Sequence, residues 1–145
     1  MISIDKTHEL EGVIINAILS GVIPAFNPQS GVCVYDDGEG HRCAFSVLLP
    51  PDFDRAEAEE KNASTVLDYH PELFNSGVFW GIENTKRNRL FFDDIQRVHD
   101  SVVLEGIRAG ISREKMAAQI KHAIKSFFQG YRSAVVAVQD PDGEV

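Results

Sequence analysis

Apolar residues recur three or four positions apart in three long segments of the chain, and this spacing marks one face of a helix. The segments are 7–20, 88–110 and 113–131. Their stripes consist of Leu10, Val13, Ile14, Ala17 and Ile18 in the first, Phe91, Ile95, Val98 and Val102 in the second, and Met116, Ile120, Ala123, Ile124, Phe127 and Tyr131 in the third. Gly21 and Pro24 would end the first helix, and Ser112 is a favourable N-cap for the third. We therefore predict three main helices.

The segment 31–50, GVCVYDDGEGHRCAFSVLLP, places a turn-forming run between two apolar stretches and predicts a β-hairpin. With Gly38 at the centre of the turn, Cys33 lies opposite Cys43 and Tyr35 lies opposite His41. These four side chains then share one face of the hairpin.

The remaining segments complete the predicted fold. The β-branched run SAVVAV, residues 133–138, favours an additional strand. The last residues, 139–145, read as an acidic C-terminal tail. We predict an α+β fold in which three main helices pack with a small β-hairpin, in a single domain over residues 1–138.

The two cysteines allow three interpretations. Directly opposite positions in a hairpin are close enough for a disulfide. A zinc clip of Cys33, His41 and Cys43 would need a further ligand pair at metal spacing, and the sequence has none. Since thiols in the cytosol stay reduced and buried cysteine behaves as a small apolar residue, we predict two reduced, packed thiols.

The charge and composition of the chain bear on whether it binds nucleic acid or membranes. The chain has 22 acidic and 14 basic residues, for a formal net charge of −8. This charge repels phosphate backbones, so nucleic acid is not expected as a partner. No apolar stretch approaches the about 18 residues of a membrane helix, and the N-terminal sequence lacks the pattern of a signal peptide. We expect a cytoplasmic protein that contacts no membrane and needs no cofactor.

The doublet His99–Asp100 in the second predicted helix is a candidate for metal chemistry. Phosphohydrolases of the HD type hold metal ions with a histidine, a later His-Asp doublet and a further aspartate. His70 precedes the doublet, so His70, His99 and Asp100 form a candidate metal site. The alternative is structural, with His99 bordering the apolar stripe of its helix.

A pattern of eight residues connects the hairpin with this doublet. They are Tyr35, Arg42, Cys43, Ala44, Pro50, Gln96, His99 and Asp100. Over residues 32–100 the chain resembles a family of small uncharacterised proteins of tailed phages and prophages, although Phe45 and Ser46 stand where that family has small residues. The resemblance implies a phage or prophage origin and a place in the cytoplasm of the bacterial host, but no particular activity.

The leading functional hypothesis is a non-enzymatic phage or prophage accessory protein that binds a host or phage protein, for example to inhibit a host process. Aromatic residues in irregular segments outside the helical stripes, such as Trp80, are candidate anchors for such a partner or for self-association. Phe127 and Phe128 are adjacent on the third helix, so one of them must point away from the core. We assign partner contacts to Trp80, Phe127 and Phe128. The alternatives are the metal-dependent phosphohydrolase and a module that sequesters a small ligand with Tyr35, Arg42 and Trp80.

Overall fold

The computed structural model of the protein describes residues 1–27 and 32–139, and most of these residues are helical. The described residues form four α-helices, which are α1 (Ile4–Leu19), α2 (Ala63–Tyr69), α3 (Lys86–Ala109) and α4 (Arg113–Gln139). Short 3-10 helices η1 to η4 cover Ser46–Leu48, Arg55–Glu57, Pro71–Asn75 and Gly77–Phe79. The strands β1 (Phe26–Asn27) and β2 (Val32–Cys33) have two residues each and pair antiparallel.

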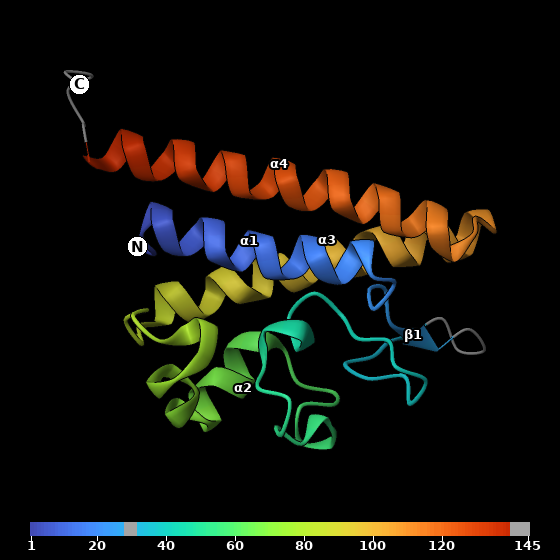
Figure 1. Ribbon diagram of the computed structural model, residues 1–145, viewed down its shortest axis with the longest axis horizontal. Coiled ribbons are helices and arrows are strands. Elements are labelled where there is room, and N and C mark those ends of the chain that lie inside the picture. The colour runs from blue at the N-terminus through green and yellow to red at the C-terminus, as the bar shows by residue number, and fades with distance from the viewer. Residues whose placement is uncertain (28–31, 140–145) are drawn as a thin grey trace.

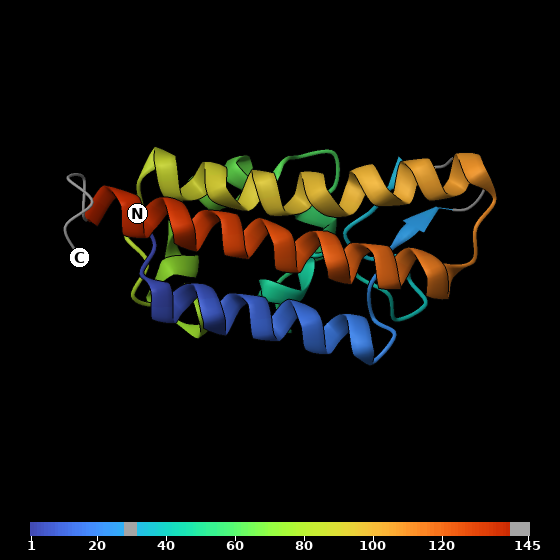
Figure 2. The same ribbon diagram turned by 90° about the horizontal axis from the view of Figure 1, so that it is seen from above.

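The three long helices lie side by side and form one half of the molecule (Figure 1). Helix α4 packs against both α1 and α3, and it runs antiparallel to them (Figure 2). The apolar stripes predict this arrangement, because each stripe is buried where two of these helices meet. Ile14 of α1, Ile95 of α3 and Ile124 of α4 are all completely buried.

Local sequence sets the ends of these helices. The Ser3 and Thr85 hydroxyl groups accept hydrogen bonds from backbone N–H groups in the first turns of α1 and α3, so both residues act as N-caps. Helix α3 ends at Gly110, which has a φ of 68° and can adopt this left-handed conformation without strain.

The segment between α1 and α3 contains α2 and the 3-10 helices η1 to η4. It packs against one side of the long helices (Figure 1). Aromatic rings connect this half to the helices. Phe45 lies 6.1 Å from Phe79, Phe79 lies 5.2 Å from Phe92, and Phe91 lies 5.8 Å from Phe128, measured between ring centroids. Aromatic contacts of this kind stabilise a fold by more than the burial of their apolar area alone. The two halves therefore share one core.

The prediction of an α+β fold is wrong. The described part of the chain is mostly helical, and the two short strands are too small to form a layer beneath the helices. Cys33 pairs with Phe26 and not with Cys43. The chain does turn back after Asp36, but the only β-bridge there among the described residues joins Asp36 to Arg42.

The prediction of a strand over residues 133–138 is also wrong, because α4 continues through this segment to Gln139. Val135 is buried one heptad after Phe128, so the helical stripe extends further than the β-branched composition indicates. The predicted acidic tail lies outside the described residues, apart from Gln139 at the end of α4. None of the described helices is long and apolar enough to cross a membrane.

Candidate functional site

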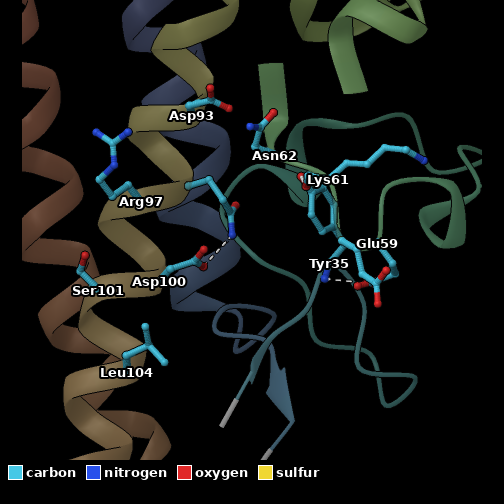
Figure 3. A pocket seen from close by; sticks show the side chains of 11 residues that line it. Tyr35, Glu59, Lys61, Asn62, Asp93, Arg97, Asp100, Ser101 and Leu104 are labelled. Carbon is cyan, nitrogen blue, oxygen red and sulfur yellow. Dashed lines mark hydrogen bonds between the residues drawn. The ribbon is translucent and has the colours of Figure 1, made fainter. Parts of the chain in front are cut away.

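A cavity of about 450 Å³ lies between α3 and the segment that precedes α2 (Figure 3). It is lined by Tyr35, by residues 59–62 and by one side of α3 from Asp93 to Leu104. We call it the α3 cavity. Its walls come from three segments that are far apart in the sequence, so only the folded chain assembles it.

Tyr35 is held in place by both its backbone and its side chain. Its N–H donates to Glu59 Oε1 at 3.2 Å, and its hydroxyl donates to the Lys61 carbonyl oxygen at 2.8 Å. Its ring meets Phe45 edge-on. Burial, together with the nearby Cys43 and acidic side chains, raises the pKa of Tyr35 far above its ordinary value. The phenol therefore stays neutral and contributes a rigid polar and aromatic surface.

Gln96 connects the cavity to the core. Its Oε1 accepts a hydrogen bond from the Phe45 N–H at 3.1 Å, and its Nε2 donates to Asp100 Oδ1 at 2.7 Å. The backbone N–H of Phe45 thus fixes which way the amide points. The amide in turn orients the Asp100 carboxylate, which lines the cavity.

His99 lies beside Asp100 but in the core. The His99 ring is completely buried, and its Nδ1 lies 2.9 Å from Asp100 Oδ1. Its Nε2 has no hydrogen-bond partner among the described residues. Because the ring has no exposed surface and does not line the cavity, His99 in this position supports the Asp100 carboxylate and does not offer a reactive group to the cavity.

Acidic residues outnumber basic residues in the lining of the α3 cavity. Four acidic residues, Glu59, Glu60, Asp93 and Asp100, line it with two basic residues, Lys61 and Arg97. The two basic side chains already bond elsewhere: Lys61 Nζ donates to the Glu57 carbonyl oxygen, and Arg97 pairs with Asp94 at 2.8 Å. The cavity therefore favours a cationic group.

Cys43 is free and completely buried. Its Sγ accepts a hydrogen bond from the Ser46 N–H at 3.4 Å. Burial raises the pKa of the Cys43 thiol to about 12, so almost no nucleophilic thiolate forms near neutral pH. The prediction of a packed thiol is confirmed for Cys43, whereas the side chain of Cys33 lies outside the described residues.

The three residues of the hypothetical phosphohydrolase site do not come together. His70 lies at the C-terminal end of α2, between Glu57 and Glu72, and His99 lies in the core beside Asp100. Among the described residues, one group of at least three potential ligands lies close enough to share a metal ion, and it consists of Asp37, Glu39 and His41.

The residues of the hypothetical small-ligand site also lie apart. Tyr35 lines the α3 cavity, and Arg42 lines a different cavity, of about 670 Å³, against α1. Trp80 is 66% exposed and lines neither.

The predicted partner contacts differ in their accessibility. Phe128 is completely buried, and the half-buried Phe127 packs against Phe91 with ring centroids 5.4 Å apart. Both phenylalanines therefore contribute to the core, and only Trp80 of the three offers an open surface.

Sequence reasoning named Tyr35 and Asp100 but did not assign the other residues of the α3 cavity to a site. Gln96 had a signal, since it precedes His99 and Asp100 by three and four positions and so shares their side of a helix. Nothing in the sequence marks Glu59 or Asp93 as a site residue, because acidic residues are common on protein surfaces. Asp93 also serves the fold, since its Oδ1 accepts a hydrogen bond from the Ser64 N–H in the first turn of α2.

Five of the eight residues in the pattern that joins the predicted hairpin to the His-Asp doublet lie at or next to this site. Tyr35, Gln96 and Asp100 line the α3 cavity, His99 bonds to Asp100, and Cys43 is buried behind them close to Gln96. Comparisons with protein-family models, with curated proteins and with solved structures found no match to this chain.

Proposed function

We propose that this chain is a non-enzymatic phage or prophage accessory protein that acts in the cytoplasm of the bacterial host by binding a host or phage protein. The α3 cavity is its binding site, and a basic side chain of the partner enters it. The observation that carries this proposal is the excess of oriented carboxylates around a cavity of about 450 Å³.

The size and lining of the cavity support recognition of a side chain. A lysine or arginine side chain has an apolar stem and a cationic head. Leu104 is 40% exposed at the cavity, and the buried ring of Tyr35 lines it, so both can contact the stem. Asp100 and Glu59 can pair with the head. Hydrogen bonds to carboxylates are stronger than those between neutral groups.

The chemical state of the neighbouring groups supports binding over catalysis. A catalytic cysteine must form a thiolate, and any catalytic side chain must be reachable by substrate. Cys43 is completely buried and its pKa is raised, while the His99 ring has no exposed surface. These two residues are therefore assigned to the support of the site.

Charge reversal at the cavity tests the proposal. Immobilised protein is incubated with a lysate of the bacterial host, and captured proteins are quantified by mass spectrometry. We expect Glu60→Lys to reduce capture of a specific partner on the order of tenfold, because it places a cation where the partner brings one. Glu105→Lys is the matched control, because it makes the same charge change on α3 outside the α3 cavity.

A second pair of variants tests the apolar contact. Leu104 and Leu90 are both on α3 and are 40% and 44% exposed, but only Leu104 lines the cavity. Leu104→Asp should abolish capture, and Leu90→Asp should not. Capture that is equal in all four variants, or the absence of any captured partner, would contradict the proposed function.

A further inference from the structure

The turn between Asp36 and Arg42 gathers three side chains of metal-binding type. Asp37, Glu39 and His41 each present one ligand atom, and these atoms lie within 4.8 Å of one another. They occupy alternate positions of the sequence DDGEGH. Gly38 and Gly40, with φ of 78° and 89°, are the residues between them, and their left-handed backbone wraps the turn so that the three side chains converge.

Asp37 is fixed more firmly than an ordinary surface carboxylate. Its Oδ1 accepts hydrogen bonds from the N–H groups of Glu39 at 2.8 Å and His41 at 3.1 Å. Its Oδ2 is thereby directed toward the His41 ring, 2.5 Å from Nδ1. The side chain of Asp37 is 11% exposed and that of His41 is 24% exposed, so the carboxylate and the imidazole are mostly withdrawn from solvent.

A second histidine of this chain, His70, also lies beside two carboxylates, but these three side chains do not converge on one point. Glu57 lies 3.4 Å from His70 Nε2, and Glu72 lies 3.1 Å from His70 Nδ1. These two carboxylates flank opposite ring nitrogens, so one ion cannot contact both of them and the ring. The turn at His41 has the same donor types in a convergent arrangement.

We propose that Asp37, Glu39 and His41 form a binding site for one first-row divalent transition-metal ion. Imidazole nitrogen favours zinc, cobalt and similar ions over calcium and magnesium, which prefer oxygen ligands alone. The three side chains hold the ion, and water completes its coordination, because Glu39 lies on the exposed side of the turn.

The test uses tag-free, full-length protein titrated with Zn²⁺ alone in a calorimeter, and with Co²⁺ alone while its visible absorption is recorded. We expect one ion per chain, and an absorption spectrum without a cobalt–thiolate band, since the site contains no sulfur. His41→Gln and Glu39→Gln should each weaken binding at least about tenfold, because loss of even an outer-shell partner weakens metal sites by that factor.

His70→Gln is the matched control and should leave both titrations unchanged. Circular dichroism of each variant checks that the fold persists. The proposal is overturned if neither ion binds, if binding survives His41→Gln, if it is lost in His70→Gln, or if a thiolate band shows that cysteine holds the ion. None of these outcomes depends on whether the α3 cavity binds a partner.

Discussion

Arg55 is a buried cation that neutral oxygen atoms stabilise. It is only 6% exposed, and it donates hydrogen bonds to Ser46 Oγ and to the carbonyl oxygens of Ser46, Leu49, Pro50, Pro51 and Phe53. Burial lowers the pKa of its guanidinium, which nevertheless remains charged. Buried carbonyl groups need hydrogen-bond donors, which regular secondary structure normally supplies. In this loop the guanidinium of Arg55 supplies them.

Replacement of Arg55 should destabilise the protein more than any exposed arginine would. Arg55→Met leaves buried carbonyl groups without donors, and we expect it to lower the free energy of unfolding by about 2–4 kcal/mol. Arg55→Lys should restore little of this loss, because an ammonium group cannot reproduce the planar fork of donors. Urea denaturation measures both variants. Arg97→Met, at an exposed position of α3, is the control and should change stability by less than about 1 kcal/mol. Equal effects at the two positions would contradict the role of Arg55.

The residues of the candidate site show the limit of sequence reasoning at this scale. The spacing of Gln96, His99 and Asp100 places them on one side of a helix, but which of them faces a cavity depends on the chain that packs there. His99 is turned to the core, whereas Gln96 and Asp100 line the cavity, and Gln96 also accepts a hydrogen bond from the Phe45 N–H. The convergence of Asp37, Glu39 and His41 depends on two glycines with positive φ, and side-chain composition does not reveal that.

At the scale of elements, two glycines within long helices have opposite surroundings. A Cβ atom added at Gly130 of α4 would meet nothing within 4 Å. A Cβ atom added at Gly106 of α3 would lie 2.8 Å from Met116 Cγ and 3.1 Å from two atoms of Ile111. Gly106 therefore permits the close approach of α3 and α4 near the turn that joins them.

This difference predicts opposite effects of the same substitution. Gly130→Ala should raise the free energy of unfolding by about 0.5–1 kcal/mol, because alanine loses less backbone entropy in a helix. Gly106→Ala gains the same helical preference but crowds the contact, so we expect a net loss of about 1–2 kcal/mol. Thermal and urea denaturation would test both values. A stabilising Gly106→Ala would show that the two helices can separate without cost.

Helical periodicity predicted the three long helices, because each buries a continuous stripe. It did not predict where strands form. Strand pairing requires a partner, and Cys33 pairs with Phe26, which belongs to a segment that the sequence does not mark as a strand. The β-branched valines of residues 133–138 favour a strand, but Val135 continues the spacing of Ile124 and Phe128, and this packing outweighs the weak preference of valine against helices.

At the scale of the whole molecule, the aromatic contacts join the long helices to the irregular half. Phe92 contacts both Phe45 and Phe79 of that half, and Phe91 contacts Phe127 and Phe128 of α4. Neither half can open without exposing rings of the other. The single domain stays a prediction, and these contacts are the reason to test it by unfolding.

We therefore expect one cooperative unfolding transition. In urea, far-ultraviolet circular dichroism follows the helices, and near-ultraviolet circular dichroism follows the packed aromatic rings. The two curves should have the same midpoint. Phe92→Leu should shift both midpoints equally, since the leucine removes ring contacts on both sides. Two separate midpoints would show that the halves unfold independently.

The position of α4 also has a consequence for synthesis on the ribosome. Helix α4 follows all the other elements in the chain, yet it packs against both α1 and α3. While α4 is still within the exit tunnel, the apolar faces of α1 and α3 that it covers are open to water. The nascent chain at this stage is a substrate for chaperones that bind exposed apolar segments, and it becomes safe from aggregation only when its last long helix has emerged.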